Sequence, residues 1–129
     1  MNPARTTCMV QVALALLAAL FGLLTIFAGM RVLAGADPGY VVFRPLLIYN
    51  TVMGFIYMLA GFVIWRGVRP GLYAAAAVFL LNLLVLAAVA WLYTAGQGVA
   101  RDSVRAMTLR TGVWLALTLG LAGLSRQRA

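Results

Sequence analysis

The chain has 129 residues, of which 65% are hydrophobic and only 9% are charged, and its mean hydropathy is +1.03. Soluble domains carry about 25% charged residues, so this composition excludes a soluble globular protein and indicates an integral membrane protein. The sequence contains no His, one Cys and ten basic residues, all of them Arg, and its net charge is +8.

These absences restrict the chemistry open to a single chain. Without His or Glu, haem bound through histidine, histidine-based zinc sites and paired-carboxylate catalysis are excluded. Cys8 stands alone, so a dithiol redox pair is excluded as well. We therefore expect no enzyme activity, no cofactor and no metal. The arginine charge predicts contact with anionic lipid head groups and no nucleic acid partner.

Four apolar stretches are long enough to cross a bilayer, whose hydrocarbon core needs about 20 helical residues. We predict an all-α fold, an integral membrane four-helix bundle that runs up-down-up-down, with a tight hairpin between the second and third helices. Residues 1–129 form a single transmembrane domain, with helices at about 8–30, 45–66, 70–94 and 104–124.

The first helix carries a continuous stripe of small or weakly polar residues, a pattern that lets two helix backbones approach closely in lipid. The stripe consists of Gln11, Ala15, Ala18, Gly22, Thr25 and Gly29. An alternative is that residues 1–36 form a cleaved signal peptide, because Ala34-Gly35-Ala36 resembles a signal peptidase site. The apolar stretch is longer than a usual signal core and Arg31 precedes the motif, so we favour retention.

The second helix is the segment around which the bundle is expected to form. One of its faces carries a polar and small-residue stripe, expected to face the third helix, made of Asn50, Gly54, Tyr57 and Gly61. Residues 67–69 connect the two helices so tightly that they must be antiparallel neighbours. Asn82 in the third helix then falls level with a point between Asn50 and Tyr57, and either could be its hydrogen-bond partner.

The fourth helix is the least apolar of the four. Asp102 or Ser103 is its predicted N-cap. Its charge-free part, residues 111–124, is short, so the crossing must include Arg110, placed near one interface with its side chain snorkelling outward. A second stripe of small residues follows, made of Gly112, Ala116, Gly120 and Gly123.

Four crossings bring both termini to one side of the membrane. The ten arginines divide equally between the two sides, so their number alone does not decide the orientation by the positive-inside rule. The orientation then depends on the N-terminus, the two aspartates and the burial of Arg110. These favour both termini in the cytoplasm. The chain also looks like a small bacterial-type membrane protein, so we expect it in the inner membrane of a bacterium. An equal division is also what a dual-topology antiparallel dimer needs, and this alternative stays open.

The candidate ligand-binding or lipid-binding residues gather at the end opposite the termini and along the second and third helices. They are Arg44, Tyr49, Asn50, Tyr57, Asn82, Tyr93, Gln97, Arg101 and Arg105. Arginines beside two helix N-termini suggest either phospholipid phosphates within an aromatic belt or a pocket for an anionic or amphiphilic ligand. Asn50 and Asn82 fit either hydrogen bonding between helices or the lining of a polar path.

We favour a non-catalytic membrane protein, either an accessory or scaffold subunit or a lipid-binding bundle, with membrane lipids as partners and a homo-oligomer or larger membrane complex as its assembly. The alternative is a small oligomeric transporter or channel for an anion or amphiphile through the stripe of Asn50, Tyr57 and Asn82. The chain resembles neither small multidrug transporters, because its first helix lacks glutamate, nor membrane disulfide-forming proteins, because it has one cysteine. It also lacks the glycine-rich and phenylalanine-containing signatures of small fluoride channels.

Overall fold

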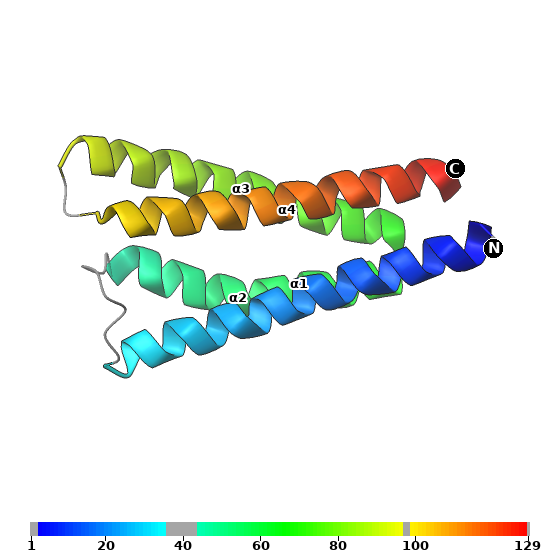
Figure 1. The fold of residues 1–129 in the computed structure, drawn as a ribbon, viewed down its shortest axis with the longest axis horizontal. Helices are drawn as coiled ribbons and strands as arrows, with labels where there is room; N and C mark the ends of the chain where they lie inside the picture. The colour runs from blue at the N-terminus through cyan, green and yellow to red at the C-terminus, as the bar shows by residue number, and fades with distance from the viewer. Residues whose placement is uncertain (1–2, 36–43, 97–98, 129) are drawn as a thin grey trace.

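The computed structural model describes residues 3–35, 44–96 and 99–128. This part of the chain is helical, with no strand, and contains four helices, shown in Figure 1. They are α1 (Pro3–Leu33), α2 (Arg44–Arg66), α3 (Val68–Thr94) and α4 (Arg101–Arg128). Each is long and apolar enough to cross a membrane. The predicted all-α class and the four helices are confirmed.

The helices extend beyond their predicted limits, most of all at the two ends of the chain. α1 starts at Pro3, where proline suits a first helical turn because its missing N–H has no intrahelical acceptor there. α4 starts at Arg101, so Asp102 lies within its first turn and Ser103 follows it. Neither residue is the N-cap, and that prediction was wrong. The carboxylate of Asp102 instead lies in the first turn, where the positive end of the helix dipole stabilises its negative charge.

A single residue, Gly67, separates α2 from α3. The observed connection is shorter than the three residues predicted, because Val68 and Arg69 already belong to α3. The two helices also approach closely beside this turn. A Cβ added to Gly71 would lie 2.7 Å from Cα of Ile64, so only glycine fits there without displacing α2.

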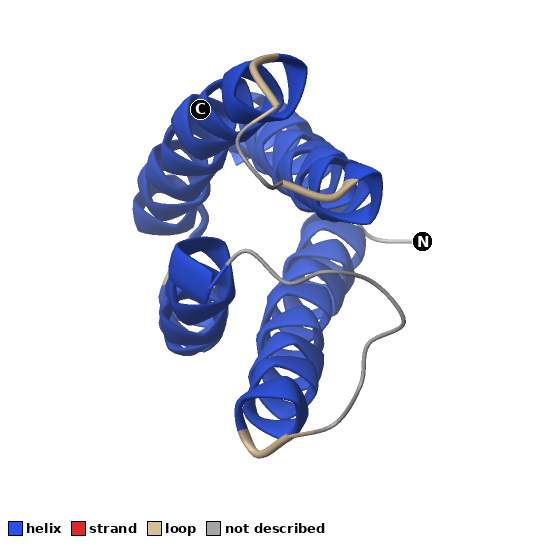
Figure 2. Cartoon of the chain, turned by 90° about the vertical axis from the view of Figure 1, so that its left-hand side faces the viewer, coloured by secondary structure: helices blue, strands red, loops and turns tan. Residues whose placement is uncertain are grey.

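The four helices pack as two pairs joined by the Gly67 turn. α1 lies along α2, and α3 lies along α4, while the contact between α1 and α4 is much less extensive. Both chain termini lie at one end of the molecule in Figure 1. Seen end-on in Figure 2, the helices surround a common interior, into which the main cluster of buried side chains packs.

Small residues make the contact between α1 and α2 very close. A Cβ added to Gly22 would lie 2.6 Å from the carbonyl oxygen of Gly54, and one added to Gly61 would lie 2.9 Å from the carbonyl oxygen of Ala15. The close approach predicted from the α1 stripe is therefore confirmed. Because Gln11 also donates from Nε2 to the carbonyl oxygens of Ile64 at 2.8 Å and Trp65 at 3.2 Å, it satisfies orphan groups at the C-terminal end of α2.

The expectation that the whole α2 stripe faces α3 was wrong. Gly54 and Gly61 pack against α1, whereas Tyr57 reaches α3. At 100° per residue the stripe covers an arc of about 60°, which is wide enough for its two edges to meet different helices. The stripes of α1 and α2 are thus used within the bundle. By contrast, Gly112, Ala116 and Gly123 of α4 are exposed.

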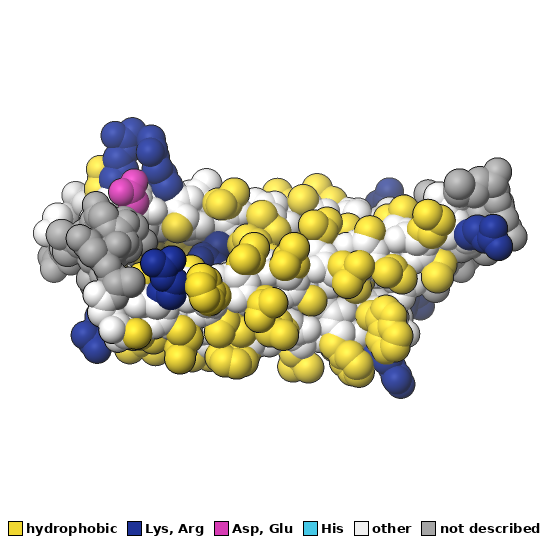
Figure 3. All heavy atoms as spheres, turned by 60° about the horizontal axis from the view of Figure 1, so that its bottom comes forward, with side chains coloured by type: hydrophobic (Ala, Val, Ile, Leu, Met, Phe, Trp, Pro, Cys, Tyr) yellow, Lys and Arg dark blue, Asp and Glu magenta, His cyan; other side chains and the backbone are white. Residues whose placement is uncertain are grey.

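The outer surface is strongly apolar. Large hydrophobic side chains on all four helices are exposed, and Figure 3 shows them covering the flank of the molecule between charged ends. A soluble monomer rarely exposes contiguous apolar surface on this scale. This surface fits contact with lipid.

Candidate functional site

Asn82 joins two tyrosines of α2 in the centre of the bundle. The hydroxyl of Tyr49 donates to Oδ1 of Asn82 at 2.9 Å, and Nδ2 of Asn82 donates to the hydroxyl of Tyr57 at 3.0 Å. Asn82 and Tyr57 are both 0% exposed. Of the two partners predicted for Asn82, Asn50 and Tyr57, the second is confirmed, and its hydrogen bond links α2 to α3.

Asn50 does not take part in this network. It is half-buried, and its Oδ1 is buried without a hydrogen-bond partner among the described residues. The place considered for it beside Asn82 is taken by Tyr49, the preceding residue. Neighbouring side chains on a helix point about 100° apart but lie at nearly the same height along its axis. Counting residues along the axis therefore could not tell which of the two faces Asn82.

Arg110 enters the bundle instead of snorkelling outward, so that prediction was wrong. Its Nη1 donates to Oγ1 of Thr25 on α1 at 2.8 Å, and its guanidinium carbon lies 5.7 Å from the ring centroid of Phe21. Arg110 lies about 13 Å along the axis from the first residue of α4, which makes α1 a nearer source of polar contact than the helix end. Its charge also acts on the hydroxyls of Tyr49 and Tyr57.

Aromatic rings hold this region together. The Tyr57 ring lies 5.0 Å from the Trp114 ring and 5.5 Å from the Phe21 ring, centroid to centroid. Trp114 is 0% exposed, and its Nε1 has no hydrogen-bond partner within residues 3–35, 44–96 and 99–128. Nε of Arg110 is likewise buried and unpaired there. We call this group the interior polar cluster: Thr25, Tyr49, Tyr57, Asn82, Arg110 and Trp114.

The remaining sequence candidates lie elsewhere. Arg44, Tyr93, Arg101 and Arg105 are exposed, whereas Gln97 lies outside the described residues. Figure 3 shows arginines around an aspartate at one end of the molecule. The predicted site therefore divides into an exposed set and a buried set. Sequence patterns alone do not mark Thr25, Arg110 or Trp114 as site residues, because they resemble packing and interface residues.

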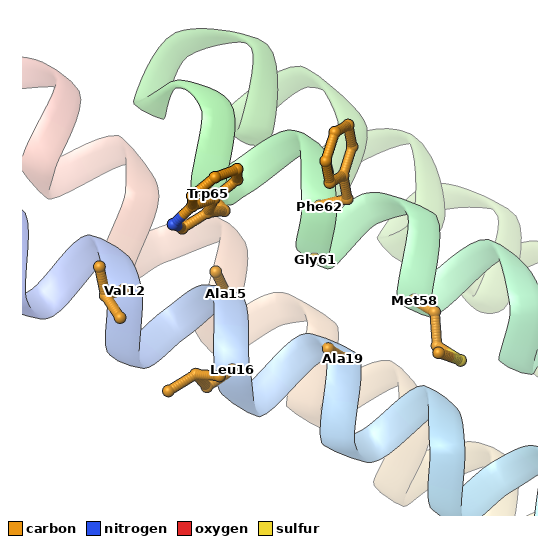
Figure 4. A pocket seen from close by; sticks show the side chains of 8 residues that line it. All are labelled: Val12, Ala15, Leu16, Ala19, Met58, Gly61, Phe62 and Trp65. Carbon is orange, nitrogen blue, oxygen red and sulfur yellow. The ribbon is translucent and has the colours of Figure 1, made fainter.

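A second feature is an apolar groove of about 310 Å³ between α1 and α2, shown in Figure 4. It is lined by Val12, Ala15, Leu16, Ala19, Met58, Gly61, Phe62 and Trp65. The small residues Ala15, Ala19 and Gly61 form its floor between the larger side chains at its edges. Arg66 follows at the end of α2, with its guanidinium carbon 6.0 Å from the Phe62 ring centroid.

The side chains of the described residues offer little metal chemistry. No three or more of His, Cys, Asp and Glu come together within this part of the chain. Cys8 is exposed on α1. The arrangement instead supplies hydrogen-bond donors and a fixed positive charge inside the bundle, and an apolar groove outside it.

Comparison with known proteins adds no relative from which a role could be transferred: no protein-family model matches the chain, and neither a curated protein nor a solved structure is significantly similar to it.

Proposed function

We propose that the protein is a non-catalytic lipid-binding bundle of the bacterial inner membrane, serving as an accessory or scaffold subunit. In this proposal residues 1–129 form one transmembrane domain whose helices cross up-down-up-down. The hydropathy of the four helices and the position of both termini at one end of the bundle support it. The close packing of α1 on α2 supports retention of residues 1–36, because losing α1 would expose the glycine face of α2 to lipid.

The observation that carries the lipid-binding role is the groove between α1 and α2, with Arg66 beside it. Its lining side chains are almost entirely apolar, which suits an acyl chain because an alkyl group needs no hydrogen-bond partner. The Phe62 and Trp65 rings, 6.1 Å apart, stand at the same end as Arg66. Aromatic rings and arginines mark the level of lipid head groups. An anionic phospholipid therefore fits with its phosphate at Arg66 and one tail in the groove.

Filling the groove should weaken lipid binding. In Val12→Phe an exposed lining valine becomes a ring that occupies the space of the acyl chain, and we expect affinity for phosphatidylglycerol to fall at least about fourfold, the equivalent of one buried CH₂ group. Native mass spectrometry of the protein in an uncharged detergent measures the lipid-bound fraction. Val10→Phe is the matched control, because Val10 and Val12 are similarly exposed on α1, at 39% and 37%, and only Val12 lines the groove.

The head group provides an independent check of the same proposal. Arg66→Gln should lower the preference for phosphatidylglycerol over phosphatidylcholine about fivefold, since one arginine near an anionic surface contributes about 1 kcal/mol. Arg69→Gln removes an equally exposed charge from the same end of the bundle, without the contact to Phe62, and should change the preference less. Equal effects of the two arginine variants, or of the two valine variants, would show that lipid is not held in the groove.

The outer face of α4 supports a role as a subunit. Gly112 and Gly123 have no atom within 4 Å of an added Cβ, and Ala116 between them is exposed. Such a strip allows a second helix to approach closely in lipid, as in a homo-oligomer or a larger membrane complex.

A second candidate is a small oligomeric transporter or channel for an anion or amphiphile, and the positive charge of Arg110 inside the bundle favours it. Tyr57 and Asn82 are fully buried, so conduction would require the helices to separate. Reconstituted protein should then release chloride or dodecanoate from liposomes faster than protein-free liposomes do. Equal release rates with and without protein for both solutes would remove this candidate.

A further inference from the structure

We propose that the interior polar cluster binds an oxyanion with one negative charge, a carboxylate or a phosphate ester, held by Arg110 and Trp114 of α4. This site lies inside the bundle and is separate from the groove on its outer surface. It does not depend on lipid binding in the groove or on transport.

The first reason is the uncompensated charge of Arg110. A guanidinium stays protonated in proteins, and within a membrane-spanning bundle such a charge requires a partner. The groups beside Arg110 include the hydroxyl of Thr25, the ring of Phe21 and the hydroxyl of Tyr57, and none of these carries a negative charge. Asp102 is exposed and lies eight residues earlier on α4, about 12 Å along the axis. No described carboxylate therefore neutralises Arg110.

The second reason is a pair of buried donors without acceptors. Nε of Arg110 and Nε1 of Trp114 carry hydrogens that they can only donate, and neither has a hydrogen-bond partner among the described residues. The two residues are four positions apart, so they lie one turn apart on the same face of α4. Buried donors are nearly always paired, which makes two unpaired donors on one face a mark of a missing acceptor.

The surrounding side chains add donors. Thr25 accepts a hydrogen bond from Arg110 and keeps its own hydroxyl proton to donate. Tyr57 accepts from Nδ2 of Asn82, while its own hydroxyl lies 3.2 Å from Oδ1 of Asn82, an atom that Tyr49 already approaches at 2.9 Å. The Tyr57 proton can therefore turn from Asn82 toward an incoming oxygen without leaving Asn82 unpaired.

These features define the chemical class of the ligand. One fixed positive charge favours one negative charge, because a dianion would keep an unpaired charge in the bundle interior. The guanidinium edge and the indole N–H are directional donors, which suit the separate oxygens of a carboxylate or phosphate. Arg110 remains partly exposed, and α1 and α4 contact each other less than the other packed pairs, so an amphiphile can bring its head group in between these helices.

Binding of radiolabelled dodecanoate to the protein in an uncharged detergent tests the site. We expect Arg110→Gln to weaken binding about tenfold or more, because it removes a hydrogen-bonding charge. Arg126→Gln removes the same charge from an exposed position of α4 and should leave the affinity unchanged. Competition should occur with methyl dodecyl phosphate, a phosphodiester with one negative charge, and not with dodecanol. Competition by acetate or inorganic phosphate at equal concentration would identify a free anion as the ligand, and its absence an amphiphile.

Trp114→Phe tests the site independently of the arginine. It keeps an aromatic ring beside Tyr57 and removes the N–H together with the second ring of the indole, and we expect dodecanoate affinity to fall about fivefold in protein whose helix content by circular dichroism is unchanged. Unchanged affinity in both Arg110→Gln and Trp114→Phe would overturn the proposal, as would equal losses in Arg126→Gln and Arg110→Gln or competition by dodecanol. Val12→Phe fills the groove and leaves Arg110 and Trp114 in place, so Arg110→Gln should weaken dodecanoate binding as much in the Val12→Phe background as alone, which distinguishes this site from the groove.

Discussion

Replacing Gly22 with alanine should destabilise the protein by about 1–3 kcal/mol, the usual cost of forcing extra atoms into a well-packed contact. The added Cβ would lie 2.6 Å from the carbonyl oxygen of Gly54 and 2.8 Å from the backbone nitrogen of Met58. Both are backbone atoms that no rotamer change can move, so α1 and α2 must separate. Unfolding in mixed micelles of increasing denaturing detergent measures the change.

Gly112→Ala is the matched control for this prediction. Gly112 lies within α4, is exposed, and has no atom within 4 Å of an added Cβ. Since alanine favours a helix over glycine by roughly 0.5–1 kcal/mol, this variant should be neutral or slightly more stable. If Gly22→Ala proved as stable as Gly112→Ala, the close α1–α2 contact would be wrong.

Replacing Tyr57 with alanine should have the largest effect on stability, about 3–5 kcal/mol, as for other fully buried aromatic residues. The variant loses the ring contacts with Phe21 and Trp114 and leaves the amide of Asn82 with an unpaired group in the interior. The free energy of unfolding in mixed micelles is again the measured quantity.

Two further variants separate the parts of this effect. Tyr57→Phe keeps both ring contacts and removes only the hydroxyl, so it should cost about 1 kcal/mol. Tyr73→Ala truncates a tyrosine that is 68% exposed on α3, and should change stability by less than about 0.5 kcal/mol. A Tyr57→Ala protein as stable as Tyr73→Ala would contradict the placement of Tyr57 at the centre of the bundle.

Much of the fold follows from composition and periodicity. Apolar length predicts the four helices, and the few residues between Arg66 and Pro70 predict the tight turn. The spacing of small residues predicts the close contact of α1, because backbones can approach in lipid only where side chains are small. Counting residues outward from the Gly67 turn places Asn82 level with a point between Asn50 and Tyr57, since both helices rise equally per residue.

The parts that sequence reasoning missed depend on which helices are neighbours. Periodicity places Gly54 and Tyr57 on one face of α2, but only the assembled bundle directs the first toward α1 and the second toward α3. The outward snorkelling expected for Arg110 assumes that lipid surrounds the residue. Thr25 and Phe21 on α1 change that environment, and they lie 85 and 89 residues earlier in the chain.

The one-residue link at Gly67 bears on how the protein is made. If α2 and α3 are both spans, no chain remains between them to be passed across a membrane separately, so the two must enter as a helical hairpin. Arg66 and Arg69 flank the link, and in that case they would act as a single topogenic signal that retains the hairpin tip on one side. Any inversion of the protein therefore requires the hairpin to turn over as a unit, and charge substitutions at these two arginines should control orientation more strongly than substitutions at either terminus.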